Sequence, residues 1–143
     1  MCCKISLITA LDQLYQHLIQ IQAEQLNPWN CNFKNGRLTF LWLYDDSLSG
    51  EIPESIGKLT FLDTLNLSYN QLTGNLPKSI GRLTRLNWLY LYRNQLSGMM
   101  PDSLCNIYLN LTNAYFAYNQ FCPPYPGCVP IEKIGAQDIS NCP

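Results

Sequence analysis

The sequence predicts an α/β solenoid in which short strands stack side by side as one parallel sheet. The stretch from Leu62 to Pro77 recurs 24 residues earlier and 24 residues later, and a fourth copy follows at a shift of 25. The three regular copies contain L-x-x-L-x-L, which places alternate leucines on one side of an extended segment. Such a segment cannot bury its apolar face alone, so successive copies stack around one continuous leucine core.

The first expected element is a helix over residues 5–26. Its apolar residues form one broad stripe along a helix: Ile8, Leu11, Leu14 or Tyr15, Leu18, and Ile21 or Gln22. Asn27-Pro28 ends the segment, and we interpret it as a helix that caps the first coil. A signal peptide is the competing interpretation, but Asp12 interrupts the short apolar core and no small-residue cleavage site follows.

Each repeat should then supply a strand, a turn and a short helical segment. The strands are expected to begin near Phe40, Thr64, Trp88 and Asn113. The glycine of the S-G-x-[IL]-P stretch permits a turn with positive φ, and the proline removes a donor where the chain changes direction. The S-[IL]-G-x-L stretches should form helical turns on the convex side. In the third copy Cys105 replaces the glycine and the regular repeat fails, so we expect the C-terminal cap to start organising at this point.

The asparagine that ends each strand, as at Asn70 and Asn94, lies where the chain turns. Its amide carries a donor and an acceptor, so it can satisfy backbone groups of neighbouring coils. Asp46 replaces it in the first copy and can only accept while ionised, which fits a coil at the end of the ladder.

Residues 36–121 resemble the plant-type leucine-rich repeat, L-x-x-L-x-L-x-x-N-x-L-[ST]-G-x-[IL]-P-x-S-[IL]-G-x-L-T. The resemblance implies a right-handed coil with a concave parallel sheet, an N-terminal cap helix and a cysteine-bearing C-terminal cap. The expected divisions are a helical cap over 1–36, four repeats over 37–121 and the C-terminal cap over 122–143. The family is a recognition scaffold, so the resemblance implies a short extracellular protein or a fragment of a receptor-like ectodomain.

All seven cysteines lie outside the three regular coils. Disulfides would hold caps over the open solenoid ends and would imply an oxidising compartment. Cys122 is expected to pair with Cys128 or Cys142, and Cys31 with Cys2 or Cys3, which leaves one cysteine over. The candidates are Cys31, Cys105, Cys122, Cys128 and Cys142. A zinc site is the alternative, but the spacing lacks C-x2-C and His17 is the only histidine; we therefore expect no metal.

The composition and the motifs of the chain argue against several classes of function. The 143 residues carry a formal net charge of -1, and we expect no basic stripe and no nucleic-acid partner. No apolar run is long enough for membrane insertion. The chain has no G-x-S-x-G or H-E-x-x-H motif, so neither an enzyme nor a cofactor is expected. We expect an extracellular or cell-surface location, with a cytoplasmic one as the alternative because no clear signal peptide is present.

The positions between the leucines face outward on the concave sheet, and six of the nine Tyr and two of the three Trp occur there. Large aromatic rings with polar tips are typical of binding hot spots. The alternative is that aromatics simply form good strands and pack across them. The candidate ligand-binding residues are Phe40, Trp42, Tyr44, Asp45, Asn66, Tyr69, Trp88, Tyr90, Tyr92, Arg93, Tyr115 and Tyr118.

These residues favour a non-enzymatic module that recognises a protein, a peptide or a glycan. A structural or self-associating fragment of a larger receptor is the alternative, and binding to a regular lattice such as ice is a third hypothesis. Two glycosylation sequons begin at Asn66 and Asn110. A glycan on Asn66 would obstruct the concave face.

Overall fold

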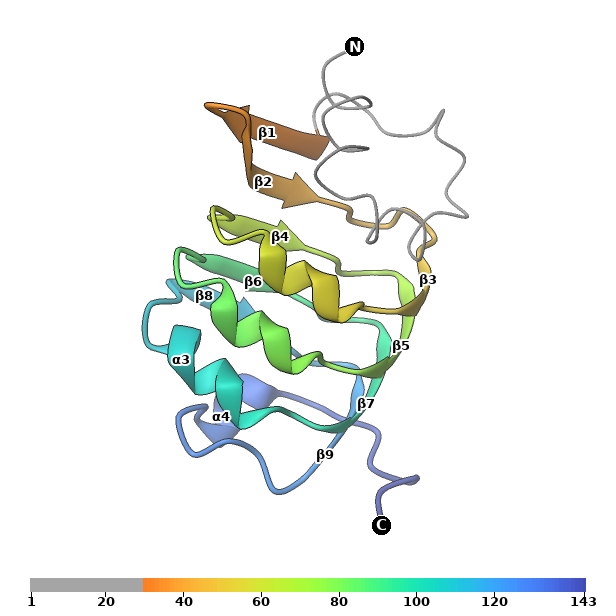
Figure 1. Ribbon diagram of the computed structural model, residues 1–143. Helices are drawn as coiled ribbons and strands as arrows, with labels where there is room; N and C mark the ends of the chain where they lie inside the picture. The colour runs from red at the N-terminus through yellow and green to blue at the C-terminus, as the bar shows by residue number, and fades with distance from the viewer. Residues whose placement is uncertain (1–29) are drawn as a thin grey trace.

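The computed structural model describes residues 30–143, and the predicted cap helix over 5–26 lies outside the described residues. Successive coils stack into a solenoid (Figure 1). One sheet has the order β1-β2-β4-β6-β8, and β2 through β8 pair in parallel as the repeat predicts. Its strands are β1 (Cys31–Lys34), β2 (Arg37–Trp42), β4 (Thr64–Asn66), β6 (Trp88–Tyr90) and β8 (Asn113–Tyr115).

The strand β1 was not expected, because residues 31–36 fell within the predicted helical cap. It pairs antiparallel with β2 through the two-residue turn Asn35-Gly36, whose φ angles are 52° and 73°. Asn-Gly between two strands favours a hairpin turn with positive φ at both positions. The signal was therefore present in the sequence, and the hairpin covers the otherwise open edge of β2.

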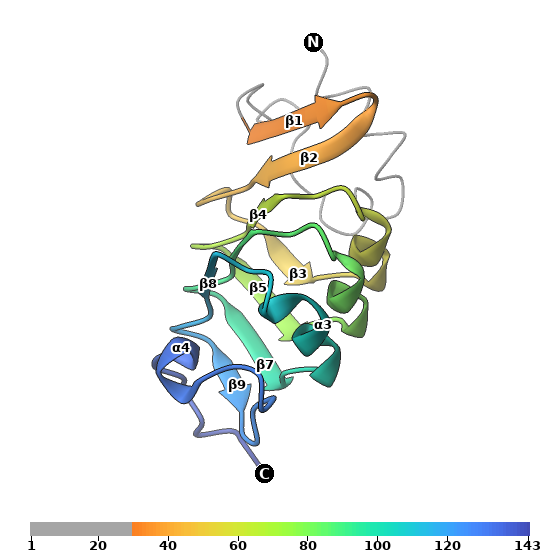
Figure 2. The ribbon, with the colours of Figure 1, turned by 90° about the vertical axis from the view of Figure 1, so that its left-hand side faces the viewer.

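A second sheet runs along the solenoid where we expected only turns (Figure 2). Its parallel strands are β3 (Ser49–Glu51), β5 (Gln71–Asn75), β7 (Gln95–Met99) and β9 (Gln120–Cys122). Leu72 and Leu96 are fully buried there, while the glutamine before each is exposed. The expected positive φ is confirmed at Gly50, Gly74 and Gly98, with values of 88°, 72° and 68°.

Short helices line the side opposite the first sheet: η2 (Glu54–Lys58), η3 (Lys78–Arg82), η4 (Asp102–Leu104) and α3 (Cys105–Tyr108). A proline immediately precedes each of the three 3-10 helices. Gly57 and Gly81 allow neighbouring coils to approach closely, since a Cβ on Gly57 would lie 2.6 Å from the Cβ of Ser79. Cys105 occupies the equivalent position in the third regular coil.

The core is a column of leucines from the first sheet, as predicted. The six predicted core leucines are at most 5% exposed: Leu41, Leu43, Leu65, Leu67, Leu89 and Leu91. The asparagines form the expected ladder beside them. Asn94 accepts a hydrogen bond from the backbone N–H of Leu72 and donates to the carbonyls of Leu67 and Leu91. Each rung thus joins its own coil to the preceding one.

The two ends of the asparagine ladder are formed by residues other than asparagine. Asp46 takes the asparagine position in the first coil and accepts a hydrogen bond from the side chain of Asn30. Burial, followed by the neighbouring Asp45, raises the pKa of Asp46. At the other end Gln137 of the C-terminal cap accepts from the backbone N–H of Phe121 and donates to two backbone carbonyls. A glutamine from outside the repeats therefore supplies the last rung.

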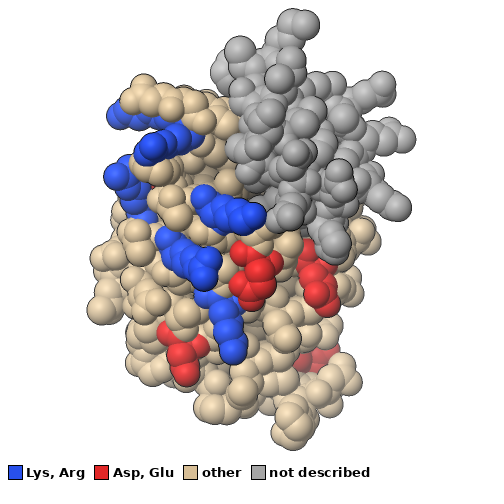
Figure 3. Space-filling model, viewed as in Figure 1, with Lys and Arg blue, Asp and Glu red and all other residues tan. Residues whose placement is uncertain are grey.

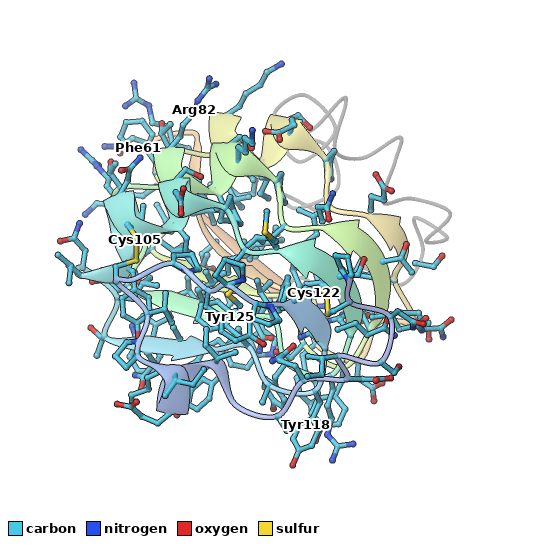
Figure 4. All side chains as sticks on the ribbon, turned by 90° about the horizontal axis from the view of Figure 1, so that it is seen from below. Phe61, Arg82, Cys105, Tyr118, Cys122 and Tyr125 are labelled. Carbon is cyan, nitrogen blue, oxygen red and sulfur yellow. A yellow bond between two sulfur atoms is a disulfide. The ribbon has the colours of Figure 1, made fainter. Side chains whose placement is uncertain are left out.

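The C-terminal cap contains the short helix α4 (Ile131–Ile134) and is tied to the repeats by two disulfides. Cys105 bonds Cys128, and Cys122 bonds Cys142, one of the two partners expected for it. Both bonded positions of the repeat region, Cys105 and Cys122, are labelled in Figure 4. Cys31 is also disulfide-bonded. The cap thus has covalent links to both the helical side and the second sheet.

Candidate ligand-binding face

The register of the first sheet brings the predicted aromatic positions into rows across the coils. Trp42, Asn66, Tyr90 and Tyr115 are direct partners along β2, β4, β6 and β8. Neighbouring strands lie about 4.8 Å apart, which is close enough for large side chains of adjacent coils to meet. The leucine that alternates with them in each regular strand is buried on the other side of the sheet.

The rings on this side form one connected cluster, which we call the aromatic face. Seven pairs of rings have centroids 5.0 to 6.2 Å apart. Tyr90 and Tyr115 stack with an interplanar angle of 13°, whereas Tyr69 meets Tyr92 edge to face at 80°. Both arrangements are favourable for aromatic rings. The members are Phe40, Trp42, Tyr44, Tyr69, Trp88, Tyr90, Tyr92 and Tyr115.

The second coil is covered by the rings of its two neighbours. Trp42 and Tyr90 approach to 5.9 Å although β4 lies between their strands. The small side chains of Asn66 and Ser68 lie beneath this aromatic layer and are 2% and 0% exposed. Asn66 Oδ1 accepts a hydrogen bond from the backbone N–H of Ser68, whereas the Ser68 hydroxyl has no partner. The expectation that Asn66 stands open on the concave face is therefore wrong.

Much of the aromatic surface nevertheless remains in water. Trp42, Tyr44, Trp88 and Tyr69 are 36–40% exposed, and Tyr115 is 50% exposed. Phe40, Tyr90 and Tyr92 are half-buried. The rings line an open hollow of about 490 Å³, which Asn66 and Ala117 also line. Ala117 was not among the predicted site residues.

Three tyrosines of the aromatic face, Tyr44, Tyr90 and Tyr92, have a raised pKa. Burial raises the pKa of Tyr44, and the neighbouring Tyr69 and Tyr92 raise it further. Burial also raises the pKa of Tyr90, with a second contribution from Tyr115. These hydroxyls can therefore donate and accept hydrogen bonds to a neutral or charged ligand over the whole physiological pH range.

The polar members of the predicted site lie at one rim of the aromatic face. Four residues at one repeat position adopt left-handed backbone angles, with φ between 55° and 58°: Asp45, Tyr69, Arg93 and Tyr118. The Arg93 guanidinium lies 5.1 Å from the Tyr69 ring centroid and 5.0 Å from that of Tyr118. The fold thus brings the predicted residues to one side of the sheet, with Asn66 beneath the others.

The described part of the chain shows neither a candidate metal site nor a helix that could span a membrane. Residues 30–143 contain no group of three or more His, Cys, Asp or Glu side chains placed to hold a metal ion. Within the same range no helix is long and apolar enough to cross a membrane.

The fold is a solenoid scaffold with an exposed aromatic face on one sheet. The leucine-rich repeat family model matches residues 37–59, 61–83 and 85–107. These three segments are leucine-rich repeats, and their sequence is of the plant type. A comparison with curated proteins found no match.

Solved structures with similar folds include plant receptor ectodomains. The ectodomain of the receptor kinase SOBIR1 from Arabidopsis thaliana is 26% identical with a TM-score of 0.68, over 82% of this chain and 68% of that chain. A chain of the BIR3–SERK2 complex from Arabidopsis thaliana is 26% identical with a TM-score of 0.59, over 76% and 74%.

A third similar chain belongs to the Arabidopsis receptor kinase HAESA in complex with the peptide hormone IDA and the co-receptor SERK1. It is 37% identical with a TM-score of 0.54, over 57% of this chain and 13% of that chain. The similarity, together with the disulfides, is consistent with an interaction module of extracellular type.

Proposed function

We propose that the chain is a non-enzymatic recognition module that binds a protein, peptide or polysaccharide through the aromatic face. The observation that carries the proposal is the exposure of at least a third of Trp42, Tyr44, Trp88 and Tyr115 on one connected surface. Leaving apolar surface in water forgoes about 25 cal/mol per Å² of stabilisation. A partner that covers these rings gains this driving force.

The alternative explanation, cross-strand packing alone, accounts for only part of the arrangement. Ring contacts such as the Tyr90–Tyr115 stack stabilise the sheet. Packing alone, however, gives no use for the exposed parts of Trp88 and Tyr115. Arg93 and Asp45 at the rim would orient a ligand more than they would strengthen its binding.

A screen against peptide and glycan arrays, with the protein itself as an additional probe for self-association, tests the proposal. The test variant is Trp88→Ala/Tyr115→Ala, and the control is Met99→Ala, an exposed residue of the second sheet. We expect the double variant to lose its array signals while the control keeps them. Normal binding by a folded double variant would rule out the aromatic face as the site.

An extracellular or cell-surface location follows from the same proposal. It is supported by the two C-terminal disulfides and by the receptor ectodomains among the similar structures. Immunodetection of the native protein, in cell-wall washes and in the cell interior, tests this location. Protein confined to the interior would contradict it.

A further inference from the structure

The two glycosylation sequons have the same form but lie in different surroundings once the chain is folded. They are Asn66-Leu67-Ser68 and Asn110-Leu111-Thr112, and both have leucine in the middle. An N-linked glycan is bulky and lies on the protein surface, so a folded protein can carry one only where the asparagine amide reaches solvent. The folded structure therefore distinguishes the two sites, which the sequence alone does not.

The first sequon is buried beneath the aromatic face. Asn66 is 2% exposed and Ser68 is 0% exposed. The Asn66 Oδ1 atom accepts a 2.9 Å hydrogen bond from the backbone N–H of Ser68. Above these two residues the rings of Trp42 and Tyr90 approach to 5.9 Å. A sugar bonded to the Asn66 amide would have to displace both rings, so this site is incompatible with the folded chain.

The second sequon lies in an exposed turn between α3 and β8. Asn110 follows the helix by two residues, and its backbone N–H donates a 2.9 Å hydrogen bond to the carbonyl of Ile107. The side chains of Asn110 and Thr112 are exposed. Figure 1 shows the connection from α3 to β8 at the outer edge of the solenoid. This position gives an external enzyme access to both side chains.

The asparagine of this sequon has no partner for its side chain, unlike its counterparts in the earlier coils. The position before the first leucine of each repeat is occupied by Arg37, Phe61, Arg85 and Asn110. The guanidiniums of Arg37 and Arg85 lie 4.0 and 4.4 Å from the centroid of the Phe61 ring, so these three side chains pack together. Within residues 30–143 the Asn110 amide has no hydrogen-bond partner. Its nitrogen is therefore available for modification.

The hydroxyl of the sequon is available as well. Thr112 occupies the repeat position that Asn87 occupies one coil earlier, where the Asn87 side chain donates a hydrogen bond to the carboxylate of Asp63. The backbone N–H of Thr112 donates a 2.8 Å hydrogen bond to the carbonyl of Asn87. In the described part of the chain the Thr112 hydroxyl has no such partner. The backbone is thus held by the sheet while the hydroxyl points to no group of the protein.

The surface beside this turn would gain from a hydrophilic cover. Leu109, next to Asn110, is 85% exposed and is the most exposed large apolar side chain among residues 30–143. Figure 3 shows Lys and Arg side chains over the β1–β2 hairpin and the helices η2 and η3, whereas the C-terminal end of the solenoid is mostly uncharged in this view. A glycan is solubilising, so one on Asn110 would cover Leu109.

We propose that Asn110 carries an N-linked glycan and that Asn66 does not. The co-reactant is an oligosaccharide carried on a lipid pyrophosphate, and a transferase of the secretory pathway catalyses the step. The Asn110 Nδ2 atom forms a bond to C1 of the first sugar and loses one proton. The bond between C1 and the pyrophosphate oxygen breaks, and the lipid pyrophosphate leaves with the electron pair. The inference rests on the extracellular location given under the proposed function and goes beyond recognition itself.

A glycan on Asn110 is compatible with recognition through the aromatic face. Asn110 precedes β8, whereas the rim that carries Asp45 and Arg93 follows the strands of the same sheet. Figure 4 shows Phe61, which occupies the same repeat position as Asn110, on the side of the molecule opposite Tyr118. The modification and the proposed binding site therefore lie on different parts of the surface.

The experiment sends the full chain, joined to a cleavable secretory signal, through the secretory pathway of plant cells. Enzymatic release of the glycans leaves Asp at each modified asparagine, and peptide mapping by mass spectrometry locates it. The test variant is Thr112→Ala and the matched control is Ser68→Ala, since each removes one sequon hydroxyl and keeps the asparagine. The Ser68 hydroxyl has no hydrogen-bond partner, so its removal should not destabilise the fold.

We expect wild type and Ser68→Ala to carry one glycan, on Asn110. Thr112→Ala should carry none, and Asn110→Gln should repeat that loss. Secreted, disulfide-bonded wild-type protein with an unmodified Asn110 would overturn the proposal. It would leave the proposed recognition function intact, because the added signal directs the chain into the pathway whatever its natural location.

Two other results would also contradict the proposal. One is a glycan on Asn66 in secreted protein whose disulfides have formed. The other is an unmodified Asn110 in protein from its native source. If the fusion carries the glycan and the native protein does not, the failure lies in the extracellular location and not in the accessibility of the sequon.

Discussion

Gln137 supplies the last rung of the asparagine ladder, and removing it should destabilise the chain measurably. Its Oε1 accepts a 3.1 Å hydrogen bond from the backbone N–H of Phe121, and its Nε2 donates 3.0 Å hydrogen bonds to the carbonyls of Phe116 and Ile134. Asn119 makes the equivalent three bonds one coil earlier. Gln137→Ala removes all three interactions of the final rung.

The expected loss of unfolding free energy depends on which hydrogen bonds the three backbone partners of Gln137 keep in the variant. The Phe116 carbonyl keeps a hydrogen bond from Asn119, whereas the Phe121 N–H and the Ile134 carbonyl lose their side-chain partner. An unsatisfied buried group costs about 1–3 kcal/mol. Gln137 is only half-buried, so water replaces part of the loss. We therefore expect Gln137→Ala to lower the free energy of unfolding by about 2–4 kcal/mol.

Urea denaturation with the disulfides intact measures this change. The matched control is Gln95→Ala, because Gln95 is exposed on β7 and should change stability by less than about 0.5 kcal/mol. Gln137→Glu keeps the acceptor but turns a carboxylate toward two carbonyls, so it should be less stable at pH 7 than at pH 4. A loss below about 0.5 kcal/mol for Gln137→Ala would refute the role of Gln137 as the final rung.

Three further predictions concern the core, the acid stability and the disulfide pairing. Leu67→Ala should lower the unfolding free energy by about 2–5 kcal/mol in urea, since Leu67 is 1% exposed; a much smaller loss would contradict its core position. The lowered pKa of Glu54 means that its stabilisation is present above its ordinary pKa of 4.5 and is lost as the pH falls through the folded value. Glu54→Gln should therefore flatten the acid side of the stability profile, and an unchanged profile would exclude this link. Non-reduced peptide mapping should find Cys105–Cys128 and Cys122–Cys142, and free thiols at these four positions in protein from its native source would contradict the pairing.

The repeat made the core and the strand register predictable. A 24-residue period with L-x-x-L-x-L fixes which leucines turn inward, so the burial of Leu65 and Leu89 followed directly. The hairpin through Asn35-Gly36 was also readable from its turn sequence, but the nearby helical segment drew the interpretation to a cap. The second sheet was missed because Q-L-[ST]-G is short and contains a turn residue.

Other features depend on three-dimensional neighbours that no local pattern reveals. Asn66 is buried because the larger rings of Trp42 and Tyr90 meet above it. Gln137 reaches its rung from outside the repeat, so no periodicity marks it. The pairing of Arg37 and Arg85 on one ring joins residues two coils apart through Phe61.

The central claim, that the aromatic face is the recognition site, is tested most directly by titrating the strongest array ligand into wild-type protein and into Trp88→Ala/Tyr115→Ala. These two rings are 39% and 50% exposed, so their removal should leave the melting temperature within a few degrees of wild type. We predict that affinity falls at least about tenfold, as for the loss of hot-spot aromatics. An unchanged affinity in a folded double variant would contradict the claim, and unfolding of the variant would show that the rings serve the sheet instead.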